Sequence, residues 1–168
     1  MALMSCPECK EKISENAVSC PKCGQPLNLW RGYEWRTKVE FLGLPLVHIA
    51  FGRDKKTGKL LVAKGIVAIG QFAIGVIAIA QFGIGLLFGL GQFMASTIAI
   101  GQFAAGILFG LGQFATGATA IGQFALGKYC LAQFGIGEHV WSTKIKDPFA
   151  IDYFRSLSGK LGSFKACH

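Results

Sequence analysis

Small and large apolar residues recur with a five-residue period between Gly65 and Gly127, a stretch that contains no charged side chain. Read from Gly70, the chain runs GQFAI, GVIAI, AQFGI, GLLFGL, GQFMA, STIAI, GQFAA and GILFGL. A small residue usually stands first and a large apolar residue third. The six-residue segments begin at Gly85 and Gly106, so the longer repeat is 21 residues. Such regularity predicts a stack of similar units.

The five-residue period does not fit an α-helix. Five residues advance a helix by about 140° beyond one turn, so the Phe side chains would form no stripe. Extended segments fit better. We therefore predict a four-sided β-solenoid with about 21 residues per coil and strands about 4.8 Å apart along the stack. Phe72 and Phe93 would then share one column, and Phe82 and Phe103 another.

Two registers remain open for the interior of this solenoid. In the favoured register, the Phe rings fill the coil beside Gly or Ala. In the opposite register, Gln and Ala face inward while Phe and Ile face outward. Under both registers the outer surface is uncharged and largely apolar.

The small-x-large-x-x pattern resembles that of the pentapeptide-repeat proteins, which are right-handed four-sided β-helices. The resemblance covers about residues 65–137. The chain departs from the family where Asp or Asn usually precedes the large residue, because Gln71, Val76 and Gln81 stand there. The nucleic-acid mimicry of some family members needs acidic outer faces, so the resemblance does not imply that function here.

An apolar wall of this size indicates a membrane or a protein partner. Soluble monomers seldom expose apolar patches beyond a few hundred Å², and uncharged runs longer than 18 residues are typical of membrane proteins. We expect the bilayer, with an interface between copies of the chain as the alternative. Lipid requires internally satisfied backbone groups, so the ends of a solenoid must be covered. A third reading divides the run into transmembrane helices of ~20 residues.

Four cysteines near the amino end form two CPxC motifs, Cys6 with Cys9 and Cys20 with Cys23. Two such hooks present the four thiolates that a tetrahedral zinc ion requires. The segment resembles the short prokaryotic zinc-ribbon domain. Two disulfides are the alternative, but no secretory signal precedes Cys6, and reduced thiols fit a cytosolic face. Four thiolates leave no open position for catalysis, so we expect one structural Zn²⁺.

The flanks complete the predicted organisation. The apolar strands 46–52 and 59–63 predict a hairpin with a polar turn, and Asp147-Pro148 predicts the start of a short helix. We place His48 in a strand, His139 at the last coil and Cys130 in the core. The chain is thus mainly β, and we divide it into a zinc ribbon (1–27), a linker strand (28–40), a hairpin or cap (41–64), an apolar solenoid (65–140) and a C-terminal cap helix with a tail (141–168).

The net charge of +8 lies outside the repeat. Basic flanks match the cytoplasmic-side bias of membrane proteins and suit anionic head groups, so we expect membrane association with the ribbon and both termini on the cytoplasmic side. The aromatic cluster of 28–36 fits either a packed strand or an interfacial belt. The charges form no dense stripe typical of nucleic-acid binding.

No catalytic constellation or phosphate-binding loop is visible, so we predict no enzyme and no small-molecule substrate. As a whole, the chain resembles uncharacterised bacterial proteins with a zinc ribbon, GYEWR-like and GLPLVHIAFGRD-like stretches and AIG-type repeats. We expect a self-associating structural protein of the membrane. The alternatives are a soluble oligomeric adaptor, whose ribbon binds nucleic acid or protein, and a multi-span helical membrane protein.

Overall fold

The computed structural model describes residues 3–14, 17, 19–25, 32–54 and 59–162. The fold is mainly β with one short C-terminal helix, as the sequence predicts. Its elements are β1 (Leu3–Ser5), β2 (Lys12–Ser14), β3 (Tyr33–Arg36), β4 (Glu40–Phe41), β5 (Leu44–Pro45), β6 (Val47–Phe51), β7 (Val62–Trp141) and α1 (Pro148–Gly162).

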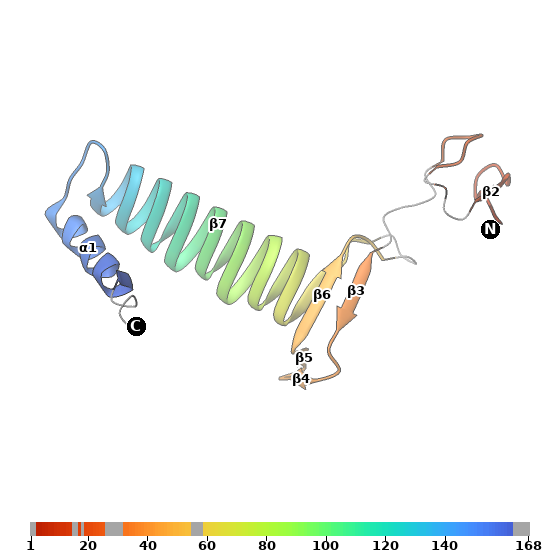
Figure 1. Cartoon of the computed structure of the whole chain (residues 1–168), viewed down its shortest axis with the longest axis horizontal. Helices are drawn as coiled ribbons and strands as arrows, with labels where there is room; N and C mark the ends of the chain where they lie inside the picture. Colours follow the sequence, from red (N-terminus) through yellow and green to blue (C-terminus); the bar gives the residue numbers. More distant parts are fainter. Residues whose placement is uncertain (1–2, 15–16, 18, 26–31, 55–58, 163–168) are drawn as a thin grey trace.

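Strand β7 is one continuous element of 80 residues that winds into a coil of successive turns (Figure 1). Ring contacts mark the length of a turn, because Phe72 stacks on Phe82 at 5.6 Å and Phe82 stacks on Phe93 at 4.9 Å. The same column continues through Phe103 and Phe114. Equivalent residues are therefore ten or eleven positions apart along the chain.

The predicted coil of about 21 residues with two Phe columns is therefore wrong. Two segments complete a turn instead of four, and the rings form one column. The reason lies at the first position of each segment. A side chain at Gly112 would collide with the backbone oxygen of Gly101, and one at Gly101 with that of Gly91. Glycine thus lets each turn lie directly against the preceding one.

The favoured interior register is also wrong. The interior of the coil is lined by alanine methyl groups, with Ala78, Ala99 and Ala104 fully buried, while Phe82, Phe93 and Phe134 are about half exposed. A turn of only two short segments leaves no lumen wide enough for rings. The opposite register is right for Ala and Phe but wrong for Gln, since Gln92 is exposed.

Met94 is the exception in this narrow interior, where it is fully buried. Glycines stand at two neighbouring interior positions. A Cβ at Gly83 would lie 2.9 Å from the Met94 methyl group, and a Cβ at Gly89 would lie 2.8 Å from it. The long side chain therefore fills the space that two missing methyl groups leave.

The amino end of the coil is covered by two strands. β6 pairs with β7 in parallel, with Val47 opposite Val67, and β3 pairs antiparallel with β6. The predicted hairpin of 41–64 keeps antiparallel pairing only next to its turn, where Arg53 pairs with Leu60 among the described residues. Its strand 46–52 corresponds to β6, which pairs with β3 and β7 instead. Residues 55–58 of its turn lie outside the described part of the chain.

The carboxyl end of the coil is covered by α1, which packs on β7 (Figure 1). Asp147 caps the helix as predicted, accepting a hydrogen bond from the backbone N–H of Phe149 at 2.8 Å. Phe154 is buried, and the Tyr153 hydroxyl lies 2.7 Å from that of Thr119. The predicted role of this helix as a cap on the coil agrees with these contacts.

The helical alternative for the repeat is wrong, since Val62–Trp141 is strand throughout. Glycine at the segment boundaries disfavours a helix and favours the close turns just described. Among the described residues, no helix combines the length and the apolar composition that a membrane crossing requires.

Candidate functional site

The four cysteines lie on two knuckles of the same local structure. In the first, the backbone N–H of Lys10 donates to the oxygen of Cys6 at 3.0 Å, and in the second that of Gly24 donates to Cys20 at 2.8 Å. Lys10 and Gly24 both have positive φ, 58° and 73°. A left-handed residue after the second cysteine turns the chain so that both thiols of a knuckle point to the same side.

The two knuckles together bring four sulfur atoms within 4.8 Å of one another. The Sγ atoms of Cys6 and Cys23 are 3.7 Å apart, and those of Cys9 and Cys20 are 3.5 Å apart. A tetrahedral ion with metal–sulfur bonds of about 2.3 Å requires sulfur–sulfur distances of about 3.8 Å. These two distances are close to the edge of such a tetrahedron, so the cluster could hold a tetrahedral metal ion.

Few other side chains support this cluster. Ile13 on β2 is buried against Cys6 and Cys20. The ammonium group of Lys22, on the second knuckle, pairs with the Glu11 carboxylate at 2.7 Å and lowers the pKa of that carboxylate. This exposed pair joins the two halves of the site.

The protein prepares at least one of the four thiols for metal binding. The pKa of Cys20 falls to about 6, because backbone N–H groups of Cys23 and Lys22 donate to its sulfur. The pKa of Cys9 is raised to about 12. The backbone of Glu11 lowers it, but desolvation and the neighbouring thiols outweigh that effect. Without an ion, the four sulfurs therefore cannot all ionise near neutral pH, and a cation would remove this conflict.

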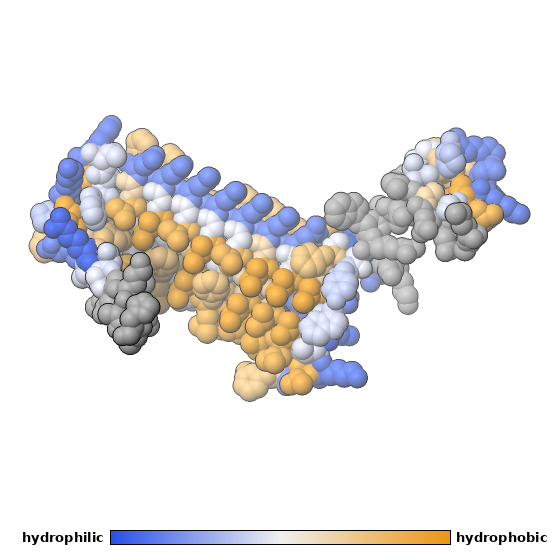
Figure 2. Space-filling view, viewed as in Figure 1, coloured by the Kyte–Doolittle hydropathy of each residue, from blue (hydrophilic) through white to orange (hydrophobic). Residues whose placement is uncertain are grey.

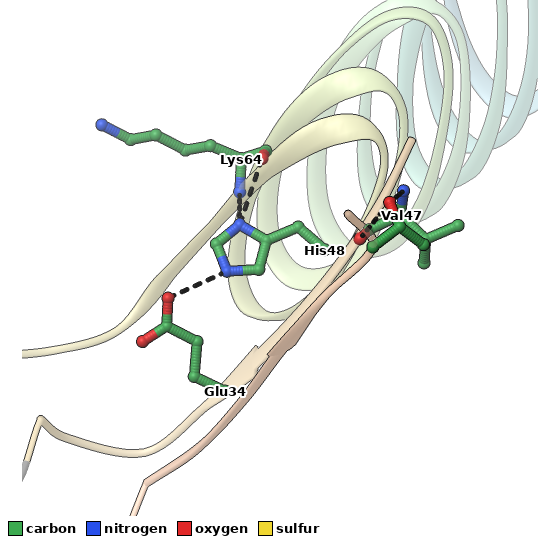
Figure 3. A network of polar contacts seen from close by, with 5 residues as sticks. Glu34, Val47, His48 and Lys64 are labelled. Carbon is green, nitrogen blue, oxygen red and sulfur yellow. Dashed lines mark hydrogen bonds and ion pairs between the residues drawn. The ribbon is translucent and has the colours of Figure 1, made fainter. Parts of the chain in front are cut away.

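A second polar group lies at the amino end of the coil, around His48 (Figure 3). Nδ1 of this buried ring lies 2.8 Å from the backbone nitrogen of Lys64 and 3.1 Å from its carbonyl oxygen, and Nε2 lies 3.3 Å from Glu34 Oε1. The ring thereby links β6, β3 and the start of β7. It is a structural link, because each nitrogen already has a partner.

The other candidate residues do not join a site. His139 lies at the last turn of the coil, as predicted, and pairs with Asp147 at 2.9 Å. Cys130 is buried in the coil interior, as predicted. Trp30, Arg31, Cys167 and His168 lie outside the described residues.

The outer surface of β7 forms an apolar wall, which we define as the exposed side chains between Lys64 and Lys128. Figure 2 shows it as a continuous hydrophobic surface, bordered along one edge by a row of hydrophilic groups. One face carries the Phe column. The other carries aliphatic side chains such as Leu86 and Ile107, which are 67% and 70% exposed.

Two grooves follow the Phe column along this wall. The first has a volume of ≈ 460 Å³ and is lined by Phe72, Phe82, Ile84 and Phe93 among others. The second has a volume of ≈ 500 Å³ and lies beside Phe114, Phe124 and Phe134. The lining of the first groove is apolar and suits hydrocarbon. The second groove is largely apolar, with Gln133, Ser142 and Lys144 also in its lining.

Sequence reasoning missed one backbone conformation and two contacts that matter to these sites. Lys10 takes the conformation that Gly24 takes in the second knuckle, and the matching position after each CPxC was the available signal. The pair of Lys22 with Glu11 and the link of His48 to Glu34 join residues that are separated in sequence. No periodic signal marks such pairs.

Comparisons with known proteins leave the chain without a family. No protein-family model matches it, and no solved structure matches it. The chain is similar to an uncharacterized protein of Haemophilus influenzae, with 67% identity over 24 residues, which cover 14% of this chain and 32% of that protein. The chain thus spans about a third of the length of the curated relative it matches, and this similarity assigns no activity.

Proposed function

We propose that this chain is a non-enzymatic structural protein of the membrane, whose coil is embedded in lipid. Its cysteine module, by which we mean the described residues up to Gln25, binds zinc on the water side. The observation that carries the proposal is the apolar wall. It has no charge between Lys64 and Lys128, and both of its faces expose large apolar side chains. In water this surface would have no apolar partner, and soluble monomers seldom expose an apolar surface of this size.

The coil satisfies the main condition that lipid imposes on a backbone. In the two-segment β-solenoid that we propose, the N–H and C=O groups of each turn pair with those of the neighbouring turns, and the strand structure of Val62–Trp141 supports this pairing. Lipid would then require that the backbone groups at the two ends be covered. β6 covers the first turn, and α1 packs near the last.

Zinc is the ion that best suits the cysteine cluster. Its four donors are thiolates at the spacing of a tetrahedron, and such sites select zinc or iron–sulfur chemistry. A four-thiolate site is closed, so the ion holds the fold and performs no reaction. In this proposal, the module is left free to bind a protein partner at the cytoplasmic surface.

The competing function is a soluble oligomeric adaptor, in which copies of the chain cover one another's walls. Both functions bury the same side chains, and self-association within the membrane is compatible with the first. They differ in the state of the purified chain in water. The competing function predicts a discrete oligomer without detergent.

Flotation with phospholipid vesicles tests the proposal. The full chain should float with vesicles, remain there after a salt wash and need detergent for release. Ile107→Asp should lower the partition coefficient onto vesicles about a hundredfold, because a charge near the bilayer centre costs about 2.5–3.5 kcal/mol. Leu3→Asp is the matched control, since Leu3 is 66% exposed on a strand of the cysteine module, and it should float like the parent chain.

Whether Ile107→Asp impairs or improves the behaviour of the chain shows whether this side chain faces lipid or water. At an exposed position of a soluble protein, Asp would leave the chain folded and raise its solubility. Recovery of the parent chain as a discrete oligomer in the salt-washed soluble fraction would overturn the membrane proposal.

A further inference from the structure

The apolar wall has a length set by charged residues at its two ends. Lys64 marks the first, and the equivalent position recurs at Ile74 and Ile84 and later at Leu126, beside Lys128. About six turns separate the two lysines, which at about 4.8 Å per turn gives about 29 Å. The hydrocarbon core of a bilayer is about 30 Å thick. The wall therefore matches the full thickness of this core.

Both faces of the coil are apolar, which excludes a simple surface placement. A coil lying flat on the membrane would keep one face in water, and that face would be polar. In β7 the Phe face and the opposite face, with Leu86 and Ile107, both expose large apolar side chains and are uncharged. The Gln column, which includes Gln92, is the polar row between them and is neutral and narrow. The two faces of the coil, apart from this row, are thus suited to lipid.

The grooves beside the Phe column indicate how the coil axis is oriented in the membrane. The first extends from Phe72 to Phe103 and so runs along the coil axis. The second continues past Phe114 and Phe134 and reaches Ile145 beyond the carboxyl end of the coil. Lipid tails run along the membrane normal. A tail can lie in these grooves over several turns only when the coil axis also follows the normal.

The two ends of the wall carry the residues expected at membrane interfaces. Tyr33 and Trp35 are exposed on β3 at the amino end, next to Arg36. Trp141 lies at the carboxyl end, with Lys144 exposed just beyond it. Aromatic residues at the boundary with charged residues beyond it are typical of interfacial belts on both sides of a bilayer.

We propose that β7 crosses the hydrocarbon core once with its axis along the membrane normal, so that the cysteine module and α1 lie on opposite sides. This inference rests on the proposed function and specifies its orientation. It replaces the expectation that both termini share one side. Residues 1–64 hold more Lys and Arg than 128–168, so the cysteine module faces the cytoplasm.

Trypsin added outside sealed vesicles tests the crossing. The exposed Lys38 reports on the amino end, and the exposed Lys144 and Lys146 report on the carboxyl end. Each reconstituted molecule should lose one end only, whichever way it was inserted, and detergent should allow both cuts. Fragment masses read the result. Cleavage of single molecules at both ends in intact vesicles would overturn the crossing while leaving membrane embedding in place. A chain that does not float would instead refute the proposed function.

A change of wall length gives a second, independent test. Duplication of residues 92–112 adds two turns, or about 10 Å. The lengthened chain should reconstitute best in phosphatidylcholine bilayers about 10 Å thicker than those favoured by the parent chain. An equally long Gly/Ser insertion after Leu42, in the turn between β4 and β5, is the control and should leave the preferred thickness unchanged. An unchanged preference in the duplicated chain would reject the crossing.

Discussion

The cysteine module and the coil of β7 are stabilised in opposite ways. The module buries little apolar surface, chiefly Ile13 with Cys6 and Cys20, and it depends on four side chains that meet at one point. The coil has no such point. Its stability is spread over repeated backbone pairing, buried alanines and stacked rings. The comparison shows that one chain can contain two kinds of region. The stability of one depends on a single bound ion, and the stability of the other depends on no single contact.

The largest expected effect separates these two regions. The double substitution Cys6→Ser/Cys9→Ser removes two ligands and should unfold the module, because structural zinc supplies on the order of 10–16 kcal/mol in small domains. Metal content should fall from one ion to none per chain, while the strand signal in circular dichroism persists. Cys130→Ser, which alters a buried cysteine of the coil, should leave the metal content at one. Loss of the strand signal in the double variant would show that module and coil form one cooperative unit.

The next effect tests the interior of the coil. Met94→Ala removes the one long interior side chain described above and should lower the free energy of unfolding by about 2–5 kcal/mol, as measured by denaturant titration. Gly83→Ala should restore part of this loss in the Met94→Ala background, because the added methyl group enters the space that the Met94 side chain has left. The same Gly83→Ala change should be destabilising beside Met94, whose methyl group lies 2.9 Å from the new Cβ. Simple additivity of the two substitutions would contradict this packing.

The smallest effect concerns the carboxyl end. The His139 side chain donates to Asp147 and, with helix capping, lowers the pKa of that carboxyl below its ordinary value of 3.8. A lowered folded-state pKa means that Asp147 stabilises the docked helix above pH 3.8 and loses this effect as the pH falls below it. Near-UV circular dichroism of the Tyr153 and Trp141 region should report the loosening. Asp147→Asn keeps a capping oxygen, so its signal should be independent of pH over the same range.

The two regions also differ in what sequence could predict. The cysteine positions predict the metal cluster well, because the chemistry fixes the spacing of the ligands and two knuckles repeat it. The period of β7 predicts strands and not helix, but it leaves the number of segments per turn open. A coil with four segments per turn and a coil with two segments per turn would both place small residues with a five-residue period. The steric contact of Gly112 with the preceding turn decides between them, and it exists only in the folded coil.

The prediction that the Phe side chains point into the coil was wrong for a related reason. Large apolar residues usually mark a core, and this rule assumes a core wide enough to hold them. In β7 the alanine column takes that role, and the rings stack outside, 4.7 Å apart for Phe103 and Phe114. The capping pair Asp147-Pro148 was predictable because it is local. The bond between Tyr153 and Thr119 was not, since it joins residues 34 positions apart.

Met94 also bears on how a repetitive chain finds the correct register during folding. Because successive turns are nearly alike, a strand that slips by one turn during folding would still find most of its partners and could remain trapped. Met94 packs against Gly83 and Gly89, and a slipped arrangement that placed an alanine at those positions would be costly. This single methionine thus acts as a register mark, and a version of the coil with alanine throughout its interior would be expected to fold into a mixture of offset forms.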